Sequence, residues 1–112
     1  MVVRGTTPGF VLEIEGYDLS GCSVIVTIER STQEINLTGN RLSISYSDET
    51  SSIAFRLTQE ETLKLTKGVA DIQVKFIDSN GIALATEKAQ FEVCPALYEE
   101  VITYGSNANN TP

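Results

Sequence analysis

The chain has 112 residues, which suffice for one domain with a two-layer core but not for two such domains. Apolar residues make up 41% of it, as in a folded globule, and no apolar run approaches the roughly 18 residues that a membrane-spanning helix needs. Eight basic and fifteen acidic side chains give a formal net charge of −7. We therefore expect neither a nucleic-acid partner, which requires a basic surface, nor a membrane partner.

The first residues lack the basic and then apolar pattern of a secretory signal, so we expect synthesis in the cytoplasm. The alternative is that a signal has been removed from the chain.

Alternation of apolar and polar residues predicts about seven strands along the chain. They cover residues 10–15, 22–30, 33–38, 41–46, 53–57, 69–77 and 82–94. We expect a loop over residues 47–52 and a hairpin turn over 78–81, where Asn80 and Gly81 suit positive φ angles. The apolar alternation of the last strand shifts near Thr86, which predicts a bulge there.

Each predicted strand has one apolar row that is expected to face the core. These rows are Phe10, Leu12 and Ile14; Val24, Val26 and Ile28; Leu42, Ile44 and Tyr46; Ile53, Phe55 and Leu57; and Ala70, Ile72, Val74 and Phe76.

A single short helix is predicted over residues 58–67, between two strand patterns. Thr58 and Glu61 have the spacing of a capping box, in which each side chain bonds the other residue's backbone N–H. Leu65 supplies apolar surface, and Gly68 suits a left-handed helix stop.

These elements predict an all-β fold, an antiparallel β-sandwich with a helical crossover between its sheets. A small closed barrel is the nearest alternative. We expect the sandwich to occupy residues 1–94, followed by an apolar C-terminal extension over 95–104 and a disordered polar tail over 105–112.

The two cysteines, Cys22 and Cys94, invite comparison with the inter-sheet disulfide of immunoglobulin domains. Cys22 falls in the predicted buried row of its strand, whereas Cys94 shares the exposed row of Gln90 and Glu92. We therefore expect two free thiols, and a disulfide only if a bulge reverses one of these rows.

The sequence offers no pattern for catalysis. It has no histidine, no CxxC metal motif and no glycine-rich phosphate loop. Adjacent carboxylates such as Glu13 and Glu15 are expected on solvated faces. We predict that the protein is not an enzyme and uses no cofactor, metal ion or small-molecule substrate.

Two apolar segments are candidates for protein–protein contact. After Pro95, apolar side chains recur with a spacing that fits a short amphipathic helix or an extended run. They are Leu97, Tyr98, Val101, Ile102 and Tyr104. They either fold back over a sheet edge or dock on another subunit. Val2 and Val3 form the second candidate, as an extended arm that pairs with a neighbour's edge strand or as a frayed, edge-capping terminus.

Several ordered strings resemble small tail and baseplate-associated proteins of phages that infect Gram-positive bacteria. They are Arg4-Gly-Thr-Thr-Pro8, Asp18-Leu-Ser-Gly21, Val24-Ile-Val-Thr27, Ile53-Ala-Phe-Arg-Leu-Thr-Gln-Glu-Glu-Thr-Leu63, Ile72-Gln-Val-Lys75 and Gly81-Ile-Ala-Leu-Ala-Thr86. The chain is similar, over most of residues 4–102, to the N-terminal immunoglobulin-like sandwich of baseplate upper proteins. No long helical or receptor-binding region accompanies it, so the resemblance implies a small virion or prophage-encoded component.

The resemblance implies a structural protein that acts by contacts within a symmetric assembly in the tail, baseplate or head–tail region. Its expected partners are further copies of itself, as a homo-oligomer, or other virion proteins. Its expected location is the virion, assembled in the bacterial host cytoplasm. The alternative is an extracellular immunoglobulin-like adhesion or carbohydrate-binding module, whose sugar-stacking residues would be Tyr17, Tyr46, Tyr98 and Tyr104.

Overall fold

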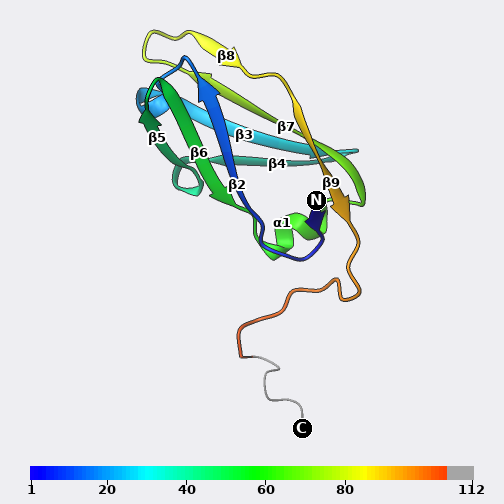
Figure 1. The fold of residues 1–112 in the computed structure, drawn as a ribbon. Coiled ribbons are helices and arrows are strands. Elements are labelled where there is room, and N and C mark those ends of the chain that lie inside the picture. The colour runs from blue at the N-terminus through cyan, green and yellow to red at the C-terminus, as the bar shows by residue number, and fades with distance from the viewer. Residues whose placement is uncertain (106–112) are drawn as a thin grey trace.

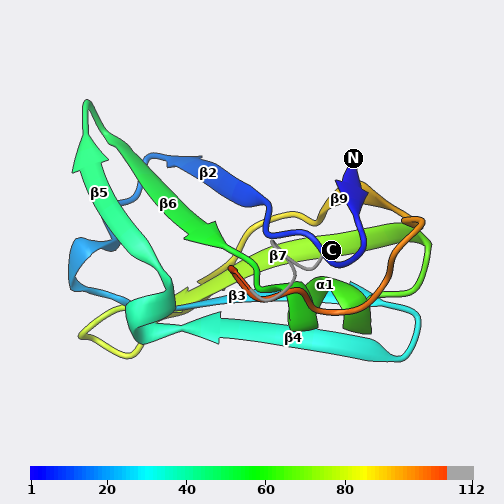
Figure 2. The same cartoon turned by 90° about the horizontal axis from the view of Figure 1, so that it is seen from below.

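The computed structural model describes residues 1–105, and two facing β-sheets dominate it (Figures 1 and 2). The strands are β1 (Val2–Val3), β2 (Gly9–Glu15), β3 (Ser23–Arg30), β4 (Gln33–Thr38), β5 (Ser43–Ser47), β6 (Thr50–Arg56), β7 (Gly68–Ile77), β8 (Ala83–Ala85) and β9 (Ala89–Cys94). The short helices are η1 (Leu19–Gly21), η2 (Gly39–Arg41) and α1 (Gln59–Lys64).

The strand order is that of an immunoglobulin-like sandwich. One sheet runs β1-β9-β7-β3-β4, with β8 also on β7, and the other runs β2-β6-β5. Strands β3, β7 and β9 thus match C, F and G of the immunoglobulin fold, while β2, β6 and β5 match B, E and D. The predicted all-β sandwich is confirmed, and α1 crosses between the sheets from β6 to β7 as expected. The first sheet is mixed rather than antiparallel, because β1 runs parallel to β9.

The count of strands within residues 1–105 is nine rather than about seven, for two reasons. The N-terminal arm forms β1, and the predicted strand over 82–94 is divided into β8 and β9. At the division, Thr86 bonds β7 through both its backbone and its side chain. The Thr86 N–H donates to the Val74 carbonyl (2.9 Å), and the Val74 N–H donates to Thr86 Oγ1 (3.1 Å). The predicted bulge is therefore a complete interruption of the strand.

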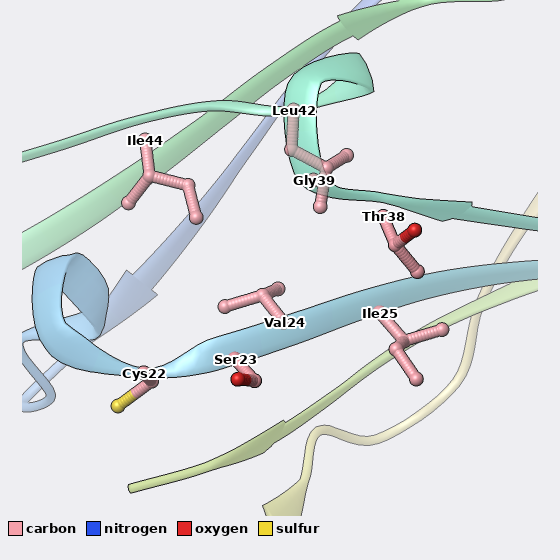
Figure 3. Close-up of a pocket in the computed structure, with 8 residues that line it drawn as sticks. All are labelled: Cys22, Ser23, Val24, Ile25, Thr38, Gly39, Leu42 and Ile44. Carbon is pink, nitrogen blue, oxygen red and sulfur yellow. The ribbon is translucent and has the colours of Figure 1, made fainter. Parts of the chain in front are cut away.

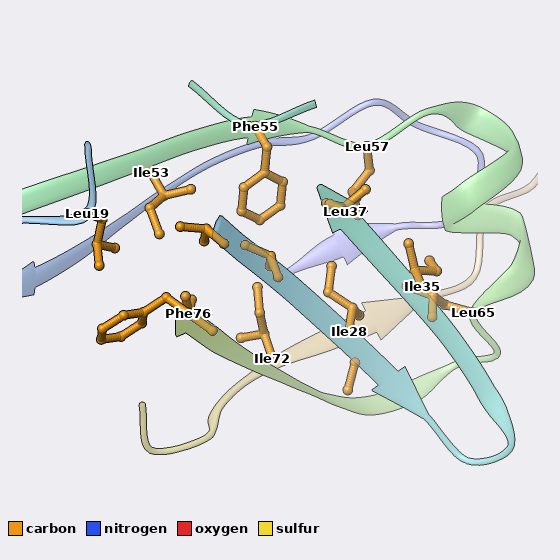
Figure 4. Packing of buried hydrophobic residues seen from close by; sticks show 14 of the residues in the cluster. Leu19, Ile28, Ile35, Leu37, Ile53, Phe55, Leu57, Leu65, Ile72 and Phe76 are labelled. Atoms are coloured by element: carbon orange, nitrogen blue, oxygen red, sulfur yellow. The ribbon is translucent and has the colours of Figure 1, made fainter. Parts of the chain in front are cut away.

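The predicted core rows of β3, β6 and β7 are confirmed, and they meet between the sheets (Figure 4). Phe10 of β2 stacks on Phe55 with ring centroids 5.1 Å apart, although the β2 row is only half-buried because β2 is an edge strand. Tyr46 departs from the prediction, since 42% of its surface is exposed at the end of β5.

The predicted loop over 47–52 is wrong. Asp48 and Glu49 form a two-residue turn with φ of 52° and 62°, and the residues after them already belong to β6. Turns of this kind usually contain Asn-Gly, so the Asp-Glu pair gave no hairpin signal. Ser51, within the predicted loop, is buried: its hydroxyl donates to the Tyr17 carbonyl (2.6 Å) and accepts the Leu19 N–H (2.9 Å).

The capping box of α1 is present as predicted. Thr58 Oγ1 accepts the Glu61 N–H (3.1 Å), and Glu61 Oε1 accepts the Thr58 N–H (2.8 Å). The helix ends earlier than residue 67, because the chain turns extended at Leu65, which is fully buried. Gly68 is not the helix stop: it begins β7 with φ of 127°, and a Cβ there would meet the Arg30 guanidinium.

The predicted hairpin turn after β7 is present. The Gly81 N–H donates to the Asp78 carbonyl (3.1 Å), and Gly81 alone takes a positive φ in this turn. Asp78 Oδ1 accepts the backbone N–H groups of Asn80 (2.9 Å) and Ile82 (3.0 Å). The turn was predicted from Asn80-Gly81 alone, but the Asp78 side chain also stabilises it.

Both thiols are free, as expected. Cys22 precedes β3 beside the Ile77 end of β7, whereas Cys94 ends β9 beside the Gly68 end. The ten residues of β7 span about 30 Å at about 3.3 Å per residue. A disulfide requires Cα atoms within about 7 Å, so these two cysteines cannot bridge within one chain.

Candidate interaction site

The N-terminal arm is part of the sandwich. Val2 pairs with Val93 and Val3 with Cys94 in the parallel ladder between β1 and β9. Val2 is buried, Val3 is half-buried, and the Arg4 N–H donates to the Cys94 carbonyl (2.9 Å). The arm therefore caps the β9 edge of its own chain, which was the alternative to pairing with a neighbour. The Val2 side chain is not exposed for contact with another subunit.

The rest of the arm runs beside α1, where one buried hydroxyl bonds it to the helix. Thr62 is fully buried, and its Oγ1 accepts the Gly5 N–H (2.9 Å) and donates to the Thr6 carbonyl (2.9 Å). The Leu57 N–H also donates to the Pro8 carbonyl (3.0 Å). These bonds fix the arm to the crossover helix without any further apolar burial by its middle residues.

Arg4 joins the arm, the helix end and the C-terminal segment, which we define as residues 95–104. Its guanidinium donates to the carbonyls of Leu63 (2.7 Å) and Leu65 (2.8 Å), two acceptors that the end of a short helix leaves unpaired. It also forms an ion pair with Glu99. The other Glu99 oxygen accepts the Ala96 N–H (2.8 Å). This bond is the main cause that lowers the pKa of Glu99, and the Arg4 guanidinium lowers it further.

A second anchor holds the far end of the C-terminal segment. The Gln59 side-chain amide donates to the Ile102 carbonyl (2.8 Å) and accepts the Ile102 N–H (2.8 Å). The amide thus bonds Ile102 as a neighbouring strand would bond a residue, with one donor and one acceptor. The segment, drawn in orange in Figure 1, is thus held by polar groups of Arg4 in the N-terminal arm and of Gln59 in α1.

The apolar side chains of this segment lie on its outside. Their exposed fractions are 109% for Leu97, 63% for Tyr98, 43% for Val101, 56% for Ile102 and 104% for Tyr104. The segment forms neither a helix nor a strand and bends at Leu97 and Glu100, so the predicted amphipathic helix is wrong. Its backbone folds back onto the domain while its apolar side chains remain in water. All five predicted contact residues are thus brought to one exposed segment.

The anchors were not found by sequence analysis. Arg4 was noted only as part of a string that carries the family resemblance. Nothing in the residue pattern around Gln59, Thr62 or Glu99 indicated that these side chains bond groups 43 to 95 residues away in the chain. Their partners are backbone groups for the most part, and the position of a backbone group follows from the fold rather than from residue type.

A groove of about 470 Å³ lies on the opposite flank, between β3 and β5 (Figure 3). Strand β4 pairs with β3 only from Ile25 onward, because η2 then carries the chain across to β5. The start of β3 is therefore left without a β4 neighbour, and Val24, Leu42 and Ile44 line the opening. The sequence analysis did not predict this groove.

Within residues 1–105, no three potential metal ligands converge. No helix in this part of the chain is long and apolar enough to cross a membrane. An exposed ion pair joins Arg41 to Glu61 beside the helix (2.7 Å), and its hydrogen bond lowers the pKa of Glu61.

Comparisons with known proteins identify the fold but no family. No family model and no curated protein matches the sequence. An uncharacterised protein of Listeria monocytogenes, solved with glucose, magnesium and calcium, matches at a TM-score of 0.54 and 18% identity over 82% of this chain, which spans 8% of that protein. AggA, the major subunit of aggregative adherence fimbriae type I of Escherichia coli, matches at 0.39 and 11% identity, over 86% of this chain and 91% of AggA. Neither is described as a phage protein, so the phage resemblance stays a prediction.

Proposed function

We propose that the protein is a non-enzymatic structural component of a phage or prophage virion, acting by protein–protein contacts in a symmetric assembly of the tail, baseplate or head–tail region. Its partners are further copies of itself or other virion proteins, and it is assembled in the bacterial host cytoplasm. The observation that carries the proposal is the C-terminal segment, whose polar groups bind the domain while its apolar side chains face outward.

The anchored segment is suited to docking for two reasons. Burying a Leu, Val or Ile side chain contributes about 1.5–3 kcal/mol, so the exposed apolar residues can supply a stable contact. The Arg4 and Gln59 anchors order the backbone before a partner binds, which reduces the entropy lost on docking. In a closed assembly, several such contacts act together and their combined strength exceeds that of any one.

Light scattering of the full chain from low to high micromolar concentration tests the proposal. We expect a discrete oligomer that Leu97→Asp with Val101→Asp converts to a monomer. The matched control places the same charges on two exposed valines of the sheets, Val11→Asp with Val69→Asp, and is expected to leave the mass unchanged. A native monomer at every concentration, or an oligomer that survives the Leu97 and Val101 changes, would contradict self-assembly through the segment.

A carbohydrate-binding module is the second candidate. The similar Listeria protein was solved with glucose, and Tyr98 and Tyr104 are exposed here as aromatic rings that could stack on a sugar. Titration calorimetry with glucose and glucose oligosaccharides separates the candidates. Binding that is lost in Tyr98→Ala with Tyr104→Ala would support the module, and no heat at millimolar sugar would exclude glucose as its ligand.

A further inference from the structure

Strand β2 lies at an open edge of the three-stranded sheet. In the immunoglobulin arrangement, the sheet that contains B, E and D has a fourth strand, A, in the order A-B-E-D. Strand β2 matches B, and β6 pairs with one side of it. Among residues 1–105 no strand pairs with its other side, because the N-terminal arm forms β1 on β9 instead (Figure 1). The position of strand A is therefore open to a strand from another chain.

Backbone groups of β2 point toward this open side. The Gly16 N–H donates to the Glu49 carbonyl (2.8 Å), which continues the ladder between β2 and β6. Along an antiparallel ladder, every second residue of a strand bonds its partner, and the residues between point the other way. Val11, Glu13 and Glu15 lie at odd spacings from Gly16, so their N–H and carbonyl groups point away from β6. No backbone hydrogen bond of residues 1–105 occupies these groups.

The outer row of β2 carries negative charge that the described chain does not neutralise. Glu13 and Glu15 are exposed, and their neighbours across the ladder are the uncharged Ser52 and Thr50. Neither glutamate belongs to an ion pair within residues 1–105. Glu87 lies on the same flank and adds to the negative charge there. Like charges at an edge disfavour pairing between copies of this chain, whereas they favour a strand with basic side chains opposite them.

The inner row of β2 borders a groove of about 170 Å³ between β2 and β7. Leu12 and Ile14 of β2 line it together with Ile72 and Val74 of β7, and it opens where the chain is divided into β8 and β9 at Thr86. Successive side chains of a strand point to opposite faces of the sheet. A strand added to β2 would therefore direct every second side chain into the groove and place the others beside the two glutamates.

We propose that β2 receives an extended segment of another protein, in which basic residues alternate with apolar ones. The basic side chains lie beside Glu13 and Glu15, the apolar side chains enter the groove, and the backbone of the segment bonds the open side of β2. An exposed ladder alone accepts any strand, so the glutamates both protect this edge and make it selective. The inference goes beyond the self-assembly proposed above, because it concerns a different edge and a different partner.

Hydrogen exchange with synthetic peptides tests the pairing. The probe is a seven-residue peptide in which lysine alternates with valine, and the matched control has the same residues with all lysines at one end. We expect the alternating peptide to slow the exchange of the Val11, Glu13 and Glu15 amides several-fold, as followed by NMR. The amides of Leu12 and Ile14 already bond β6 and should change little. The control peptide is expected to leave all five amides unchanged.

Substitutions test the role of the charge. Glu13→Gln with Glu15→Gln is expected to weaken binding of the alternating peptide several-fold, and added salt is expected to weaken its binding to the native chain. The matched control, Glu29→Gln with Glu34→Gln, removes the same charge from exposed positions of β3 and β4. It is expected to leave the affinity unchanged.

Three results would each overturn the inference. They are no binding at millimolar peptide, equal binding of the control peptide, and equal affinity after Glu13→Gln with Glu15→Gln. The last two would show that the glutamates attract cations without directing a strand, or only protect the edge. Light scattering of the Glu13→Gln, Glu15→Gln variant should give the native mass, so failure of this inference is distinguishable from failure of self-assembly.

Discussion

The two ends of the described part of the chain, residues 1–105, lie near the same helix, yet one is buried and the other is exposed. Val2 enters the core by pairing with β9, whereas Leu97, three residues past the end of β9, is fully in water. The difference follows from which surface each end meets. The arm meets the edge of β9 above the core, while the C-terminal segment meets the Arg4 guanidinium and the Gln59 amide beside α1. Apolar residues at a chain end are therefore buried only where the fold offers them an apolar site.

The largest expected effect separates the two ends directly. Val2→Asp would place a charge in a buried site without a partner, and we expect it to lower the free energy of unfolding by about 2–3 kcal/mol. Leu97→Asp, the matched change at the other end, is expected to stay within about 0.5 kcal/mol. Urea denaturation of both variants measures the contrast. Equal losses of unfolding free energy would show that Val2 and Leu97 contribute equally to the folded state.

The next effect concerns Arg4, which binds both ends. Arg4→Ala removes the donor of the Leu63 and Leu65 carbonyls together with the ion pair to Glu99, and we expect it to cost about 1–2 kcal/mol of unfolding free energy. Arg4→Lys keeps the charge but not the planar fork, so it should recover only part of that loss. Full recovery in thermal or urea unfolding would mean that Arg4 acts through charge alone.

A smaller effect is expected at Gln59, because it touches only the exposed end. Gln59→Ala should change the global free energy of unfolding by less than about 0.5 kcal/mol while releasing Ile102. Hydrogen exchange of the Ile102 amide, followed by NMR, should accelerate while that of β7 amides stays constant. Gln59→Glu retains the acceptor for the Ile102 N–H and should protect it better than Gln59→Ala does. Unchanged exchange at Ile102 would show that this anchor does not order the segment.

The smallest effect is a response to acid. The folded pKa of Glu99 lies below its ordinary value of 4.5, so its contribution is present above that value and is lost as pH falls through the folded pKa. We expect the amides near Ala96 to keep their chemical shifts from pH 7 to pH 5 and to change only in more acidic solution. Glu99→Gln should abolish this transition, and a transition that persists in Glu99→Gln would have to come from another carboxyl group.

Sequence pattern predicted the elements whose side chains alternate across a strand. The rows of β3, β6 and β7, the capping box at Thr58 and the helical crossover all follow from local residue order, because each depends on neighbours in the chain. The turn at Asp48 was missed because its positive φ angles are carried by an Asp-Glu pair, without the glycine that usually marks such a turn. The division of the last strand was read as a bulge, since the role of Thr86 depends on β7.

The candidate site was predicted in composition but not in geometry. The five apolar residues after Pro95 were identified, yet the path of their segment depends on Arg4 and Gln59, which bind Glu99 and Ile102 from distant positions in the chain. The groove beside β5 gave no local signal either. It arises because β4 ends opposite Ile25 and leaves the first residues of β3 without a β4 partner. The prediction of disorder over 105–112 concerns residues that, after Gly105, lie outside those the structure describes.

The parallel pairing of Val2 with Val93 has a consequence for biosynthesis. Strand β1 cannot take its place in the sheet until β9 has been made, about 90 residues later in the chain. At about 5–20 residues per second, a ribosome needs about 5–20 s to add those residues. Until then Val2 and Val3 lack the strand with which they pair in the folded sheet. A chaperone or an inhibitory peptide that captured residues 1–3 would therefore intercept the protein before β1 pairs with β9.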